Sequence, residues 1–166
     1  MTYLTVKWLH ILSATFMFGT GFGTAFYMFF VNRSKNVQAM AVVTRWVVRA
    51  DTWITAPAVV FQPLSGLYMM HAAGYPPSAS WLWISLSLYA LAGACWLPVL
   101  WLQWRMRDMA GQAAQALQTS GGATDAADAT GIAPRYWLYE RIWVALGFPA
   151  FGGLLVVYWL MVSKPA

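Results

Sequence analysis

One long apolar segment near the start constrains this chain more than any other feature. No formally charged residue lies between Lys7 and Arg33. At about 1.5 Å per residue, a helix of this length can cross the roughly 30 Å hydrocarbon core of a bilayer. A secretory signal peptide has a basic start and an apolar core of only about 7–15 residues, whereas here Lys7 alone precedes a much longer run. The segment is therefore predicted to be a retained transmembrane helix.

The composition extends this prediction to the whole chain. Hydrophobic residues make up 60% of the 166 residues and charged residues only 9%, whereas a soluble domain carries about a quarter charged residues. We therefore predict one transmembrane domain over residues 1–166. Cys95 is the only cysteine, which excludes an internal disulfide and a thiolate metal cluster. The net charge of +5 comes from residues that flank apolar spans, so no nucleic-acid partner is expected.

Four apolar spans predict an all-α fold. They cover about residues 4–31, 52–72, 81–104 and 136–162, and we expect them to form an up-and-down four-helix bundle. Residues 36–51 predict an interfacial helix on the inner leaflet, because apolar residues alternate there with arginines. The Ala-, Gly-, Thr- and Asp-rich stretch at about 108–134 predicts a short helical extension of the third span and a flexible cytoplasmic loop.

The distribution of lysine and arginine predicts how the chain is oriented. Eight of them lie in or beside the two long connections, and only Lys7 and Lys164 lie on the other side. The positive-inside rule then places both long connections in the cytoplasm and both termini outside, in the periplasm. We expect a multi-pass protein of a bacterial inner membrane, surrounded by the lipid bilayer. A membrane protein partner or a homo-oligomer stays possible.

The first span carries one of the two histidines of the chain. On an ideal helix, His10 shares a face with Lys7 one turn outward and with small residues such as Gly21 further in. A histidine nitrogen can bind haem iron while the ring packs on small residues and a lysine meets a propionate. His71, near the outer end of the second span, is the candidate for a second ligand.

These features also have purely structural interpretations. His10 could hydrogen-bond a neighbouring helix, and His71 could face water at the interface. Gly19 and Gly23 form a GxxxG pair, which is typical of close helix–helix packing.

The second span combines a charged start with two helix-interrupting prolines. Asp51 follows Arg49 closely, which predicts either an ion pair at the inner surface or a helix N-cap. Pro57 and Pro63 free backbone carbonyls, which are tolerated at membrane depth only against protein, water or a ligand. Gln62 is the polar residue expected to face the bundle interior, because an unpaired amide in lipid is costly.

Three stretches carry a family resemblance. "KWLHILSATFMFGTGFGTAFY", "ADTWITAPAVVFQPLSG" and "ALGFPAF…YWLMVSKP" together resemble a bacterial family of predicted integral membrane proteins of unknown function. The first helix is also distantly similar to HemJ-type protoporphyrinogen oxidases and CopD-type membrane proteins. That similarity implies haem b bound through His10. The third span holds no Lys, Arg or His, so the basic residues on later helices of the HemJ type have no counterpart here.

Three functions fit these observations. The first is a haem-b membrane redox protein, with His10 as one ligand and either His71 or an open position opposite. The second is a non-catalytic membrane subunit or scaffold. The third is a small-solute transporter that works as an oligomer. An ion-coupled pump is disfavoured because few charges are expected inside the membrane.

Overall fold

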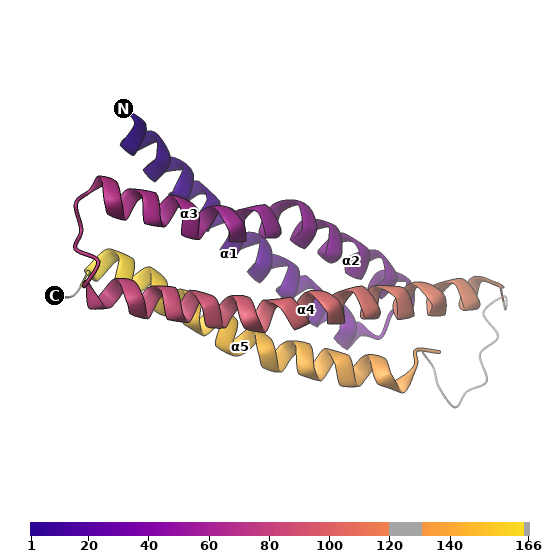
Figure 1. The fold of residues 1–166 in the computed structure, drawn as a ribbon. Helices are drawn as coiled ribbons and strands as arrows, with labels where there is room; N and C mark the ends of the chain where they lie inside the picture. The colour runs from indigo at the N-terminus through magenta and orange to yellow at the C-terminus, as the bar shows by residue number, and fades with distance from the viewer. Residues whose placement is uncertain (120–130, 165–166) are drawn as a thin grey trace.

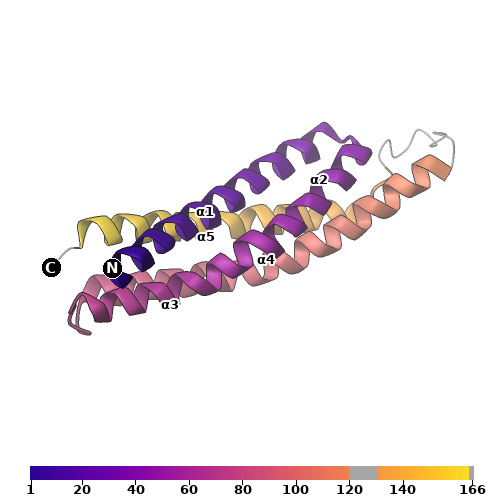
Figure 2. The same ribbon diagram turned by 90° about the horizontal axis from the view of Figure 1, so that it is seen from above.

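Helices form all the regular structure in residues 1–119 and 131–164, the parts of the chain that the computed structural model describes. The elements are α1 (Thr2–Ser34), α2 (Val37–Ala50), the π-helical turn η1 (Asp51–Thr55), α3 (Ala56–Ala72), α4 (Ser80–Thr119) and α5 (Pro134–Ser163). Because α2, η1 and α3 follow one another without a break, the chain forms four rods (Figure 1). Its first and last described residues lie at the same end of the bundle (Figures 1 and 2). The predicted all-α four-helix fold is confirmed.

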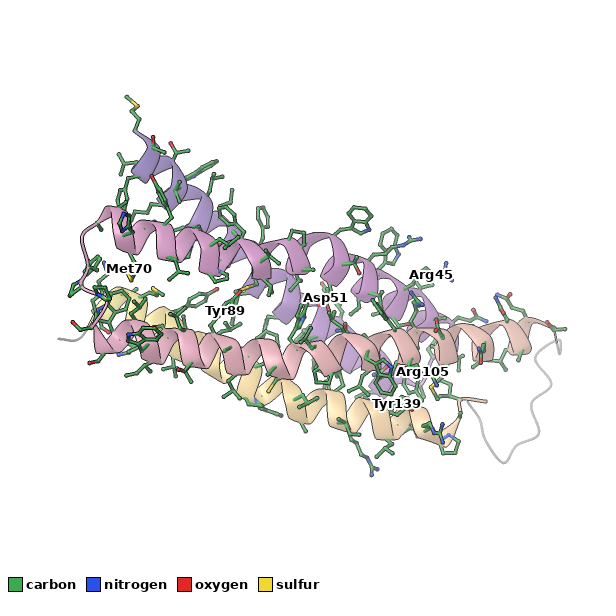
Figure 3. The ribbon with its side chains drawn as sticks, viewed as in Figure 1. Arg45, Asp51, Met70, Tyr89, Arg105 and Tyr139 are labelled. Atoms are coloured by element: carbon green, nitrogen blue, oxygen red, sulfur yellow. The ribbon has the colours of Figure 1, made fainter. Side chains whose placement is uncertain are left out.

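Three helices are long and apolar enough to cross a membrane, as judged by length and composition in the described part of the chain: α1, α4 and α5. The predicted second span, residues 52–72, is helical throughout as η1 and α3. The arginines of the long connections lie toward one end, where Figure 3 labels Arg45 and Arg105. Which side of the membrane that end faces remains a prediction.

The prediction of a separate interfacial helix at residues 36–51 is wrong. Helix α2 runs directly into the second span, and its apolar face packs against other helices instead of lying on a leaflet. Met40 and Val47, for example, belong to the same buried cluster as Met106 and Ala110 of α4. Burial against α4 is available because α4 continues well beyond the predicted third span, to Thr119. The helical extension is thus confirmed, while residues 120–130 of the predicted loop lie outside the described residues.

Proline explains the irregular turn between α2 and α3. Pro57 has no backbone N–H, so it cannot bond the carbonyl of Trp53 as a regular α-helix requires. The neighbouring Ala56 N–H instead bonds the carbonyl of Asp51, five residues back. A π-helical turn widens the helix locally and commonly occurs at functional sites. Here it leaves both Asp51 and Thr55 buried.

The larger of two buried clusters in the described bundle lies at one end, and a smaller one around Trp81 and Leu160 lies at the other. Methionines 28, 40 and 106 and Tyr136 are fully buried where α1, α2, α4 and α5 meet. Further along, α1 and α3 pack as one pair and α4 and α5 as another. Aromatic contacts join the pairs, including an edge-on contact of Phe18 with Phe151 at 5.7 Å between ring centroids. This arrangement leaves a space between the two helix pairs.

Two tyrosine hydroxyls also bridge the helix pairs. The Tyr89 hydroxyl on α4 donates to the carbonyl oxygen of Val59 on α3 at 2.7 Å (Figure 3). That carbonyl needs a donor because Pro63, four residues later, has no N–H. The Tyr158 hydroxyl on α5 donates to the carbonyl oxygen of Ala14 on α1 at 3.0 Å. The proline therefore creates the acceptor that ties α4 to α3.

We expect Tyr89→Phe to lower the free energy of unfolding by about 1 kcal/mol, since it leaves the Val59 carbonyl without a donor. Pro63→Ala restores an N–H that can bond this carbonyl, so the same change should cost less in that background. Thermal unfolding of the wild type, the two single variants and the double variant in one detergent gives the coupling between the two sites. If Tyr89→Phe lowers the free energy of unfolding equally with and without Pro63, the proline does not create the acceptor that Tyr89 bonds.

Candidate functional site

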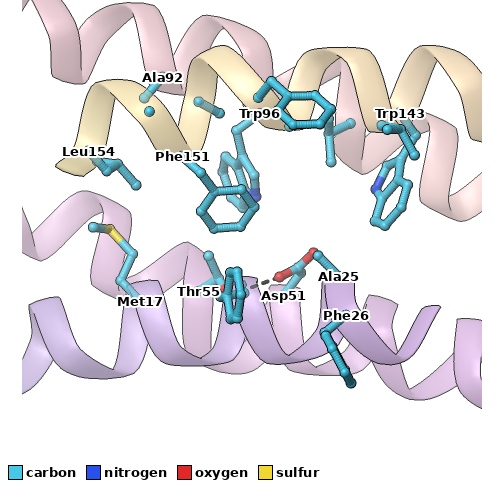
Figure 4. A pocket seen from close by; sticks show the side chains of 18 of the residues that line it. Met17, Ala25, Phe26, Asp51, Thr55, Ala92, Trp96, Trp143, Phe151 and Leu154 are labelled. Atoms are coloured by element: carbon cyan, nitrogen blue, oxygen red, sulfur yellow. Dashed lines mark hydrogen bonds between the residues drawn. The ribbon is translucent and has the colours of Figure 1, made fainter. Parts of the chain in front are cut away.

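A cavity of about 550 Å³ lies between the two helix pairs. Its walls come from α1, η1, α3, α4 and α5, and Figure 4 shows side chains from both pairs turned toward it. Aromatic rings dominate the lining: Phe22, Phe26, Phe29, Phe30, Trp96, Trp143, Phe148 and Phe151. Glycines at positions 21, 93, 147 and 152 line it as well and leave room between the helices. The size and the apolar walls are typical of a site for a small lipophilic ligand.

A small polar cluster stands out in this apolar lining. The Thr55 hydroxyl donates to Asp51 Oδ1 at 2.9 Å (Figure 4), and the Gln103 side chain from α4 lies beside Asp51. Asp51 is 3% exposed and Gln103 4%. Gln103 Oε1 is buried and has no hydrogen-bond partner within the described chain. The cluster therefore presents acceptor oxygens to a cavity that is otherwise apolar.

The expected ion pair between Asp51 and Arg49 is wrong. The Arg49 guanidinium lies over the ring of Trp46, 5.0 Å from its centroid, and the one salt bridge within residues 1–119 and 131–164 joins Arg107 to Asp108. Asp51 is not an N-cap either, because it lies inside a continuous helix. The carboxyl group is buried because α2 and α3 form one rod that turns this position toward α4.

A second polar cluster lies at the end of the bundle that holds the larger buried cluster. The Tyr136 hydroxyl donates to Asn32 Oδ1 at 2.8 Å, and both residues are fully buried. Glu140, one turn further along α5, is also buried. Asn32 Nδ2 and Glu140 Oε1 have no partner within the described residues. This cluster joins the end of α1 to the start of α5.

His10 is held by the neighbouring helix α3. Its Nδ1 is 2.7 Å from the Ser65 hydroxyl oxygen, and its backbone carbonyl accepts a hydrogen bond of 2.8 Å from Gln62 Nε2. A Cβ atom at Gly66 would lie 3.5 Å from His10 Cε1, so the small residue lets the imidazole approach α3. The interpretation of His10 as a hydrogen-bonding residue between helices is confirmed, and Gln62 faces the bundle interior as expected.

No hydrogen bond or ion pair in the described chain joins the other predicted site residues to His10. Lys7 and His71 are exposed, and His71 lies in the last turn of α3. Gly21 lines the cavity, where a Cβ would lie 3.7 Å from the Phe151 ring. His10 itself is not among the residues that line the cavity, so Gly21 and His10 do not share this space.

The GxxxG pair in α1 does not pack as expected. A Cβ atom added at Gly19 or Gly23 would have no other atom within 4 Å in the described structure. The prediction that these glycines pack closely against another helix of the same chain is therefore wrong. Phe18 and Phe22, each one position before a glycine of the pair, make the contacts with α5 through Phe151.

One ring nitrogen of His10 is hydrogen-bonded to the protein, and the other is the atom that could bind haem iron. A ligating histidine usually bonds one ring nitrogen to a protein group and binds metal with the other, and here Ser65 occupies Nδ1. Nε2 has no hydrogen-bond partner in the described part of the chain. No cluster of three or more His, Cys, Asp or Glu that could hold a metal ion occurs in that part either. Haem ligation by His10, with His71 or an open position opposite, stays a prediction.

Sequence reasoning missed Asp51 and Gln103 as site residues. The signal for Asp51 was its spacing from Thr55, since residues four apart on a helix are neighbours, followed by a proline two residues later. This spacing did not indicate a buried site, because residues 36–51 were expected to lie at the membrane surface. Gln103 lies at the end of the predicted third span, and no local pattern indicates its orientation.

The chain was compared with known families, curated proteins and solved structures. A family described as "predicted integral membrane protein (DUF2269)" matches residues 4–165. No curated protein matches, and no solved structure matches.

We expect Gln62→Leu to lower the free energy of unfolding by about 1 kcal/mol, because it removes the hydrogen bond to the His10 carbonyl. Leu64→Ala, on an exposed face of the same helix, is the control and should cost less. Chemical or thermal unfolding in detergent measures both. A Gln62→Leu protein as stable as the wild type would show that this bond adds nothing to the pairing of α1 with α3.

Proposed function

This chain belongs to the DUF2269 family of predicted integral membrane proteins, and from that premise we propose that it binds a lipophilic molecule inside its helical bundle. The observation that carries the proposal is the cavity between the two helix pairs, which is walled by aromatic rings and has one polar cluster. An apolar pocket with a few fixed polar groups is the usual form of a small-molecule site, in which the apolar walls supply affinity and the polar groups orient the ligand.

The exposure of several side chains at the cavity wall supports this proposal, because it offers a route of entry from the bilayer. Several cavity-lining side chains are also exposed on the outside of the bundle, among them Phe148 at 76% and Phe30 at 55%. An exposed phenylalanine on a membrane helix faces lipid, so a molecule dissolved in the bilayer can reach the cavity without passing through water. Binding of this kind serves the predicted small-solute transporter and equally a membrane subunit that carries a lipophilic cofactor or substrate.

We expect Gly93→Leu to abolish binding and leave the fold intact. Gly93 lines the cavity, and a Cβ there would have no other atom within 4 Å, so the new side chain fills empty space. Gly19→Leu is the matched control, because Gly19 has equal room but does not line the cavity. Lipophilic molecules that co-purify with each protein in nanodiscs are extracted and compared by mass spectrometry.

The expected result is a ligand present with the wild type and with Gly19→Leu but lost from Gly93→Leu. Equal amounts of the same molecule in all three proteins would place it in the surrounding lipid and contradict binding in the cavity.

A haem-b membrane redox protein is the second candidate. The observation that favours it is the bond of His10 Nδ1 to Ser65, which orients the imidazole and leaves Nε2 without a partner. Haem b would be held by His10, and it would supply the capacity to accept and donate one electron. This candidate is independent of the cavity, because His10 does not line that space.

Visible spectra of the purified protein test this second candidate. A Soret band that is lost in His10→Ala and kept in His71→Ala is expected, because only His10 is fixed by a neighbouring helix. The His71→Ala protein also tests the predicted second ligand. A protein that stays colourless after reconstitution with haem would end the candidate and leave the cavity proposal untouched.

A further inference from the structure

The polar cluster of the cavity offers acceptors without matching donors. Asp51 accepts a hydrogen bond from Thr55 and lies beside Gln103, while the buried Oε1 of Gln103 receives no hydrogen bond within the described chain. Both side chains are more than nine-tenths buried and line the cavity. A ligand that meets this cluster well must therefore donate hydrogen bonds.

The possible negative charge of Asp51 also favours a ligand that donates hydrogen bonds. A carboxylate buried away from water is costly unless a positive charge pairs with it. Arg49 lies over the Trp46 ring, and no ion pair to Asp51 occurs in the described chain. When Asp51 is ionised, it is a negative group for which the described chain supplies no counter-ion, and a bound cation can take that position.

The walls of the cavity favour a cation over other hydrogen-bond donors. The faces of aromatic rings attract positive charge, most strongly when water is excluded. Trp96 and Trp143, together with the phenylalanines of α1, line the same space as Asp51 (Figure 4). A protonated amine combines a positive charge with N–H donors, whereas an alcohol offers one donor and no charge.

We propose that the cavity selects lipophilic amines, with the protonated nitrogen bound by Asp51 and Gln103 and the apolar body packed among the aromatic rings. This inference rests on the proposed function, since it names the chemical class of the molecule that occupies the cavity. It assigns Asp51 as the residue that determines specificity and Gln103 as the second acceptor.

Matched aromatic ligands test the selectivity. Radiolabelled 2-naphthylmethylamine, 2-naphthylmethanol and 2-naphthaldehyde share one apolar body and differ in the polar end. Equilibrium dialysis against protein in nanodiscs, corrected with empty nanodiscs, gives their affinities. We expect the wild type to bind the amine at least about tenfold more tightly than the alcohol, since a charge-assisted hydrogen bond adds about 1.5 kcal/mol or more and about 1.4 kcal/mol equals a factor of ten. Asp51→Asn should bring the two affinities together, and Gly93→Leu should weaken all three ligands.

The other outcomes separate this inference from the proposed function. Equal binding of amine and alcohol by the wild type, or an amine preference that survives Asp51→Asn, would overturn the amine selectivity while the cavity still binds ligands. Strongest binding of the aldehyde would overturn it too, because a protonated Asp51 would then be acting as the donor. Binding of no ligand above empty nanodiscs would instead contradict the proposed function. If Asp51→Asn does not fold, Gln103→Met should reduce the amine preference, and an unchanged preference would overturn the inference.

Discussion

Polar groups in a membrane helix bundle must find their partners inside the protein, because hydrocarbon offers none. This constraint explains the contacts that join the helices here. Gln62 donates to the His10 carbonyl and Tyr89 to the Val59 carbonyl. Each contact links two different helices, so the pairing of polar groups also sets which helices lie side by side.

Prolines add to this constraint because each one leaves a carbonyl without its usual donor. Pro63 frees the Val59 carbonyl that Tyr89 then bonds, and Pro57 precludes a regular α-helical bond where the π-helical turn occurs. The first effect ties α4 to α3, and the second accompanies the burial of Asp51. The two prolines of the second rod thus shape both the contact between the helix pairs and the polar cluster of the cavity between them.

The cavity lies where the two helix pairs separate, between the larger buried cluster at one end of the bundle and a smaller cluster of Trp81, Leu82 and Leu160 at the other. Buried methionines and the Tyr136–Asn32 hydrogen bond close the bundle where α1, α2, α4 and α5 meet. Toward the other end the pairs are linked by rings and tyrosine hydroxyls, with glycines between them. Large side chains opposite small ones leave a space that no side chain of the described structure fills. A buried carboxyl group beside such a space is costly for stability alone, which is why a binding role accounts for it better than packing does.

The amino-acid sequence by itself determined the class of the fold and part of its interior. Long uncharged runs must become helices in a bilayer, and Gln62 had to face the bundle because an amide in lipid is costly; both predictions depend on local composition and periodicity alone. The tertiary structure decided what surrounds each position: that α2 packs on α4 and turns Asp51 inward, that Gly19 and Gly23 lie open, and that His10 faces Ser65 while Gly21 faces the cavity. These outcomes depend on how far each helix extends and which neighbour covers it. Sequence periodicity gives the faces of one helix but not the partner that each face meets.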